Sequence, residues 1–270
     1  MADDDFDYET EYEEERPPDP IESEAKTVIK SFFEMHMKEV FFSRQVEVIH
    51  EDQFFHWITN RAIRDLVAEG VILGEKRKLR NGGPISLLWH RSYRFYKRSA
   101  DKVIALVEKY SDPEIGESIG LHGETMVLEA FARSEFLMKG RNIREYKGEV
   151  WRGTEQNLDF IFERDSIGYG VEVKNKLGYM DLKEFSEKTE ISRFLGLCPV
   201  FIARMLPKTW IHELNMKGGF ALILKYQLYP WTHRSLAKRI AEELSLPVDA
   251  PRAIAEATME RFLRWHFKRI

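Results

Sequence analysis

The sequence predicts an α/β (α+β) protein with two folded domains: a small helix-and-hairpin domain, then a mixed sheet flanked by helices. In the first part of the chain, apolar residues at helical spacing give way to the alternation of a β-hairpin. After residue 113, helical segments alternate with short apolar strands, which is the pattern of a sheet covered by helices. The length of 270 residues is sufficient for two domains of ordinary size.

The charge is distributed unevenly along the chain. Residues 1–20 hold ten acidic residues and one basic residue, so a formal net charge of −4 divides into −9 for this segment and +5 for the rest. The segment has no apolar periodicity and ends in prolines, so we expect residues 1–20 to form an acidic disordered tail. A mildly basic body is compatible with a surface that binds phosphates.

Several classes of protein are disfavoured by composition. The single cysteine, Cys198, allows no intramolecular disulfide, and the eight histidines lack the spacing of a zinc site. No apolar run is long enough for a membrane span, and the acidic N-terminus is unlike a signal peptide. We therefore expect a cytoplasmic protein that does not bind a membrane.

Residues 21–112 are predicted to form the first domain, which ends near the Ser-Asp-Pro sequence at 111–113. We expect inward-facing side chains in the second helical region, which Gly70 ends: Trp57, Ile63, Leu66 and Val67. The expected elements are a helix (23–38), a β-rich stretch (40–49), two helices (within 50–72), a hairpin turning at 81–83 (71–90) and a connecting helix (100–110).

This order of elements resembles the winged helix-turn-helix family, and residues 62–72 are similar to its recognition helix and first wing strand. The resemblance implies DNA binding, because such domains place a helix in the major groove and a wing against phosphates. Domains of this family that bind only proteins, or that dimerise, are the alternative. The candidate DNA-binding residues lie on the exposed side of the helix (Arg61, Arg64) and on the wing (Lys76, Arg77, Lys78, Arg80).

Residues 113–270 are predicted to form the second domain. Its expected elements are a helix (121–139), three β segments (142–150, 157–163, 168–176), a helix (181–196), a strand (199–204), a helix (207–216), a strand (219–226) and two further helices.

A charged group occurs within this predicted sheet. Val171 and Val173 should point to the core, which leaves Glu172 and Lys174 on the opposite face of their strand. Asp159 on the preceding strand should lie beside Glu172. Adjacent carboxylates repel each other unless a cation lies between them, and oxygen ligands alone favour Mg²⁺ or Mn²⁺. An acid, any residue and a lysine occur in this order four times in the chain, so the strand context, not the tripeptide, carries the prediction.

A third acid, Glu124, follows Gly123 at the expected start of the helix, and Glu129 competes with it on the same helix. Together with Asp159 and the Glu172-Val-Lys174 sequence, Gly123-Glu124 resembles the PD-(D/E)XK nuclease superfamily, the restriction-endonuclease-like fold. The resemblance covers about residues 120–226, and its Gly-Glu opening is most similar to archaeal Holliday-junction resolvases and Mrr-like restriction enzymes.

The resemblance implies that Asp159 and Glu172 bind a catalytic Mg²⁺ (or Mn²⁺). It implies that Glu124 is a further ligand or positions a water, and that Lys174 positions the attacking water. It also implies a DNA substrate and a homodimer. The sequence departs from the family pattern at Leu158, where the signature has proline, and the helix at 181–196 lacks a Gln-x-x-x-Tyr signature.

The sequence thus predicts a Mg²⁺-dependent DNA endonuclease of repair or restriction, which hydrolyses phosphodiester bonds on DNA positioned by the winged helix. The first alternative is a nuclease-fold regulatory protein that binds DNA without cutting it. The second is a winged-helix transcription factor with an α/β ligand-binding domain, which would leave the pairing of Asp159 with Glu172 unexplained.

Overall fold

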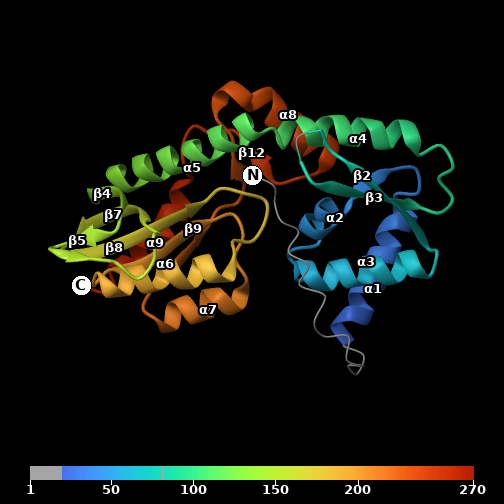
Figure 1. Cartoon of the computed structure of the whole chain (residues 1–270). Helices are drawn as coiled ribbons and strands as arrows, with labels where there is room; N and C mark the ends of the chain where they lie inside the picture. Colours follow the sequence, from blue (N-terminus) through green and yellow to red (C-terminus); the bar gives the residue numbers. More distant parts are fainter. Residues whose placement is uncertain (1–19, 81) are drawn as a thin grey trace. The chain divides into compact units, whose positions relative to one another are not determined.

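The computed structural model describes residues 20–80 and 82–270, which form two compact units (Figure 1). Within the described residues, the first unit extends to Gly116 and includes the later segment Arg239–Leu246, and the second contains Glu117–Lys238 and Pro247–Ile270. The acidic tail expected at residues 1–20 lies outside the described residues except for Pro20.

The first unit packs helices against a small antiparallel sheet of strand order β1-β3-β2. Its core includes Ile29 and Phe33 of the first helix and Leu66 of the third, all fully buried. The elements are α1 (Pro20–Met35), β1 (Val40–Phe42), α2 (Ser43–Ile49), α3 (His56–Ala68), β2 (Ile72–Lys78), β3 (Pro84–His90) and α4 (Lys97–Tyr110).

The β-rich stretch predicted at 40–49 is wrong beyond residue 42, because the valine-rich residues after it form α2. Gln45 supports the turn into this helix: its Oε1 accepts the N–H of Phe42 at 3.2 Å, and its Nε2 donates to the Leu244 carbonyl at 2.9 Å. Val46 and Val48 are buried, so tertiary packing overrides the β preference of valine. The contact with Leu244 also explains why a late segment belongs to the first unit, which the predicted domain range 113–270 does not anticipate.

The inward face of α3 differs from the predicted one at two positions. Ile63 and Leu66 are buried as expected, but Trp57 and Val67 are 47% and 37% exposed. The buried stripe follows the helical repeat through Ile58, Ile63 and Leu66, and residues 57 and 67 lie off it. Gly70 has a φ of +67°, the left-handed conformation that ends a helix.

The second unit contains a mixed five-stranded sheet of order β10-β9-β8-β7-β4, in which β8, β9 and β10 are parallel and β4, β7 and β8 are antiparallel. The remaining elements of the chain are α5 (Pro113–Arg133), β4 (Leu137–Ile143), β5 (Glu145–Tyr146), β6 (Glu149–Val150), β7 (Leu158–Arg164), β8 (Ile167–Lys174), α6 (Leu182–Phe194), β9 (Cys198–Ala203), α7 (Lys208–Met216), β10 (Phe220–Ile223), β11 (Gln227–Leu228), the 3-10 helix η1 (Trp231–His233), α8 (Arg234–Leu244), β12 (Val248–Asp249) and α9 (Glu256–His266). Residues 113–116 of α5 and 239–244 of α8 belong to the first unit.

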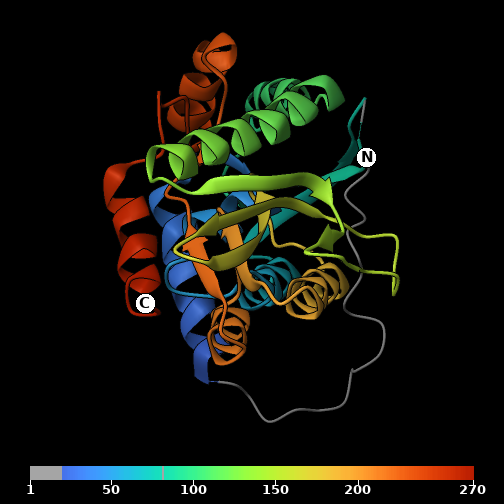
Figure 2. The same cartoon turned by 90° about the vertical axis from the view of Figure 1, so that its left-hand side faces the viewer.

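Helices cover both faces of this sheet, which confirms the predicted fold class (Figure 2). On one face, Phe131 of α5 and Phe262 of α9 pack on Phe160 and Val171. On the other, Phe185 of α6 and residues of α7 pack on the opposite side of β9. Alternation along each strand therefore sends neighbouring residues to different helical layers.

Two boundaries in the second unit differ from those predicted. The helix expected at 121–139 already begins at Pro113, a residue suited to the first turn, and ends at Arg133. Glu135 then adopts a φ of 61°, which turns the chain into β4. The β segment expected at 142–150 is divided between the end of β4 and the short strands β5 and β6.

No helix among residues 20–80 and 82–270 is both long and apolar enough to cross a membrane.

Candidate metal and catalytic site

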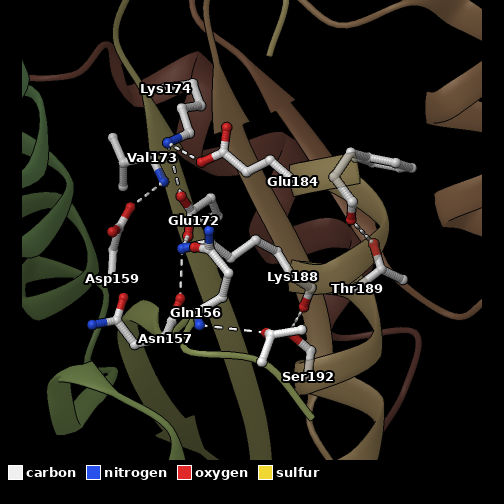
Figure 3. Close-up of polar contacts among 12 residues, drawn as sticks. Gln156, Asn157, Asp159, Glu172, Val173, Lys174, Glu184, Lys188, Thr189 and Ser192 are labelled. Atoms are coloured by element: carbon white, nitrogen blue, oxygen red, sulfur yellow. Dashed lines mark hydrogen bonds and ion pairs between the residues drawn. The ribbon is translucent and has the colours of Figure 1, made fainter. Parts of the chain in front are cut away.

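Asp159 and Glu172 lie side by side on the face of the sheet that α6 covers (Figure 3). The β7–β8 register pairs Phe160 with Val171, which places the residues one step further along, 159 and 172, opposite each other. Val171 is fully buried in the core on the other face. The Val173 N–H, next along the chain from Glu172, donates to Asp159, so the two carboxylates lie close together, as the strand pattern predicts.

Asp159 occupies an environment that disfavours its charge. Burial and the nearby carboxylate of Glu172 raise its pKa from 3.8 to about 7, although the Val173 N–H, Lys188 and Lys174 oppose the shift. The Val173 N–H donates to Asp159 Oδ2 at 2.7 Å. A cation placed between the two carboxylates would remove the repulsion that contributes to this raised pKa.

Glu172 is almost fully buried and is flanked by two ammonium groups. Its Oε1 lies 3.0 Å from Lys174 Nζ, and its Oε2 lies 2.8 Å from Lys188 Nζ. A buried carboxylate requires such pairing, because the cost of taking an unpaired charge out of water is several kcal/mol. The two lysines supply this pairing for Glu172 beneath α6.

Lys174 also contacts Glu184 of α6, whose Oε1 lies 2.7 Å from Nζ. Burial works to lower the pKa of Lys174, but Glu172 and Glu184 outweigh it, so that the pKa lies above its ordinary value. Lys174 is consequently a protonated cation at neutral pH. It can orient a water molecule or stabilise negative charge, but it cannot serve as a general base.

Sequence reasoning missed Glu184 and Lys188, which α6 brings to this site (Figure 3). They are four residues apart and therefore lie on the same side of the helix. Lys188 is 4% exposed and also donates to the Asn157 carbonyl at 2.5 Å. The sequence did contain a signal for Lys188. It is spaced three residues from both Phe185 and Ile191, so it lies on the same buried side of the helix as these apolar residues.

Glu124 is not at a helix start, as the sequence suggested, but in the middle of α5. Its Oε2 accepts from Arg141 Nη2 at 2.8 Å, and its competitor Glu129 pairs with Arg133 at 2.5 Å. Among the described residues, no three His, Cys, Asp or Glu side chains form a group that could hold a metal ion. The structure therefore brings together Asp159, Glu172 and Lys174, and leaves Glu124 in an ion pair.

Gly123 allows α5 to approach the end of β8. A Cβ at this position would lie 2.7 Å from the Cβ of Asn175, the residue that follows Lys174. Asn175 is buried, and its Nδ2 donates to the carbonyls of Ile119 and Leu228 at 2.9 and 2.7 Å. Gly123 and Asn175 thus fix α5 beside the strand that carries Glu172.

The candidate DNA-binding residues of α3 are both on its outer part. Arg61 Nη1 donates to Glu22 Oε1 of α1 at 2.5 Å, so this guanidinium already has a partner. Arg64 is exposed.

The four candidate residues of the wing have different surroundings. Lys76 and Lys78 are exposed on β2. Arg77 is held by Glu75 at 2.8 Å and by Asp101 at 2.7 Å, and Arg80 Nε forms an ion pair with Glu108 Oε2 at 3.6 Å. Lys76 and Lys78 are therefore the wing cations best placed to meet phosphates.

The donor set of Asp159 and Glu172 suits a hard divalent cation. Mg²⁺ is commonly bound by one or two carboxylates, with waters and substrate phosphate completing its shell. The raised pKa of Asp159 fits such a site, because an ion would favour the charged form. Two protein carboxylates are thus sufficient for this class of site.

Neither a protein-family model, nor a curated protein, nor a solved structure matches this chain. The functional argument consequently depends on the geometry and charge of the residues described above.

Proposed function

We propose that the chain is a Mg²⁺-dependent DNA endonuclease that hydrolyses phosphodiester bonds. The observation that carries the proposal is the placement of Asp159 beside Glu172, with the Lys174 ammonium 3.0 Å from the latter. A purely structural strand has no use for a second carboxylate beside Asp159, whose pKa is raised to about 7 by burial and by Glu172.

Each residue of the site has a separate part in this reaction. Asp159 and Glu172 would hold the cation, which polarises the phosphate and lowers the pKa of a bound water. Lys174, kept protonated by Glu184, orients the attacking water and offsets negative charge on the phosphate. Lys188 positions Glu172 by contacting the oxygen that Lys174 does not contact.

The first unit would position the DNA, and its winged helix-turn-helix character is part of the proposal. Lys76 and Lys78 of β2 would contact the phosphate backbone, with Arg64 on the exposed side of α3. A homodimer would supply one site for each DNA strand, which sedimentation of the protein with and without duplex would test.

A second candidate function is DNA binding without cleavage. It is favoured by the two lysines that already neutralise Glu172, because a tethered ammonium lowers the attraction of the site for a divalent cation. Under this alternative Lys188 and Lys174 replace the metal permanently, and the site stabilises the fold only.

A cleavage assay separates the two functions. Labelled linear duplex, single strand, flap and four-way junction are incubated with Mg²⁺ or Mn²⁺ and either wild type or Glu172→Gln. The nuclease proposal expects cleavage by wild type alone, and the DNA shape that is cut identifies the substrate. Binding of DNA without cleavage by either protein would support the second function, and equal cleavage by both would contradict the assigned site.

A further inference from the structure

The loop between β3 and α4 (Figure 1) carries basic residues and an exposed aromatic residue. Residues 91–98, which we call the Phe95 loop, read Arg-Ser-Tyr-Arg-Phe-Tyr-Lys-Arg and contain four basic residues and no acidic one. Phe95 is 85% exposed. An exposed aromatic ring within a cluster of cations suits a ligand with both an aromatic part, which can stack on the ring, and an anionic part, which can pair with the cations.

The loop is held in one conformation from both sides of Phe95. Before it, the Tyr93 hydroxyl contacts the Ser99 hydroxyl at 2.8 Å. After it, the Tyr96 ring stacks on Trp89 with centroids 3.8 Å apart, and its hydroxyl donates to Glu75 at 3.0 Å. Phe95 is therefore presented outward by anchored neighbours, which lowers the entropy that binding would cost.

The cations around Phe95 are also exposed. Lys97 and Arg98 lie in the first turn of α4, where no acidic residue and no side-chain cap is present. The partial positive charge of a helix N-terminus disfavours cations there and favours anions. Together with the exposed Arg91 and Arg94, they create a positive potential that a phosphate backbone would relieve.

The acidic residues beside the loop are already engaged. Arg77 donates to Glu75 at 2.8 Å and to Asp101 at 2.7 Å. This assigns Arg77 a role other than the DNA contact expected from the sequence: it neutralises two carboxylates that would otherwise offset the charge of the loop.

We propose that the Phe95 loop binds an unpaired nucleotide, with the base stacked on the Phe95 ring and the adjoining phosphates held by Arg94 and Arg98. A base inside a duplex shows no free face to the ring, whereas single strands, frayed ends and branch points do. The loop would therefore direct the first unit to DNA with unpaired bases. The inference extends the proposed function by naming this substrate class.

The test is binding of labelled oligothymidylate, measured by fluorescence anisotropy. EDTA is present to remove divalent metal, so that the oligonucleotide is not cleaved during the measurement. Phe95→Ala should weaken binding by about 5- to 150-fold, the range that loss of one base–aromatic stack produces. Phe95→Tyr should bind like wild type, whereas Phe95→Leu, which keeps apolar area without a stacking face, should behave like Phe95→Ala. Trp231→Ala removes another exposed aromatic and should have no effect.

The charged half of the site is tested with Arg94→Gln/Arg98→Gln, compared with Lys102→Gln further along α4. The double variant should reduce the slope of log affinity against log salt by about 1.4, since each phosphate contact to a single strand contributes about 0.7. Unchanged binding by Phe95→Ala would overturn the proposal. Equal binding by Phe95→Leu and wild type would also overturn it, because it would show that no aromatic face is required at this position. Because no metal is present, failure of the cleavage proposal would leave these results unaffected.

Discussion

Replacing Asp159 by asparagine is expected to stabilise the metal-free protein while removing one of the two candidate cation ligands. In the folded chain, burial and Glu172 raise the pKa of Asp159 from 3.8 to about 7. Ionising this carboxyl at neutral pH therefore costs folding free energy. Asparagine is uncharged, and its Oδ1 can still accept the Val173 N–H that now binds Asp159 at 2.7 Å.

The size of the effect follows from linkage between proton binding and folding. The difference between a pKa of 3.8 and one of about 7 for Asp159 corresponds to about 4 kcal/mol as an upper limit. We expect a gain of about 2–4 kcal/mol above pH 7, or about 5–10 °C in Tm. As the pH falls from about 7 to about 4, the folded wild type takes up a proton at Asp159 and the advantage of asparagine disappears.

Thermal unfolding followed by circular dichroism in EDTA, at about pH 8 and about pH 4, measures both the gain and its pH dependence. The exposed Asp52, changed to asparagine, controls for the loss of one negative charge. Added Mg²⁺ should raise the Tm of wild type but not that of Asp159→Asn, because a ligand stabilises only the state that binds it. An Asp159→Asn protein that is less stable than wild type at the higher pH would refute the reasoning.

Three further outcomes are expected. Lys174→Met should lower the rate of single-turnover cleavage by about 100-fold or more and leave DNA affinity unchanged, because a charge aimed at the phosphate acts mainly in the transition state. A cleavage rate within twofold of wild type would exclude that role. Lys188→Met should lower the free energy of unfolding by about 3 kcal/mol in urea titrations, because it deprives a buried carboxylate of one partner. The exposed Lys183→Met on the same helix should have little effect, and equal losses in the two variants would contradict the positioning role. Lys76→Gln/Lys78→Gln should weaken duplex binding with little dependence on base sequence. In anisotropy titrations at several salt concentrations, the slope of log affinity against log salt should fall by about 2. Wild-type affinity in this variant would show that β2 does not contact DNA.

The strand pattern made the centre of the candidate site predictable. Val171 and Val173 alternate with Glu172 and Lys174, and this alternation fixes which side chains share a face before any tertiary contact is known. The turn of Asp165 and Ser166 then sets the register that brings residue 159 beside 172. Local periodicity and a short hairpin were sufficient here.

The contributions of α6 and α5 were not predictable in the same way. Lys188 reaches Glu172 only because α6 returns across the sheet, and the sequence distance between the two gives no sign of this contact. The sequence places Glu124 after Gly123 at a helix start, but the helix already begins at Pro113, because proline is well accommodated in a first helical turn. Long-range packing decided both positions.

Helix and strand preferences misled at α2 and α3 for a related reason. Val46 and Val48 have side chains that favour strands, but both are buried in the short helix α2, and this packing outweighs the strand preference. Trp57 was expected in the core because it is large and apolar, yet it lies off the buried stripe and stacks on Phe55. Apolar character alone did not determine the face on which a residue lies.

The most direct test of the central claim is plasmid cleavage with Mg²⁺ at about pH 8 by wild type and Asp159→Asn, each verified as folded. A more stable variant cannot lose activity by unfolding, so the comparison isolates the cation site. The account predicts nicked or linear product from wild type and none from Asp159→Asn. Equal cleavage by the two proteins would contradict the assignment of Asp159 and Glu172 as the metal-binding centre of a nuclease.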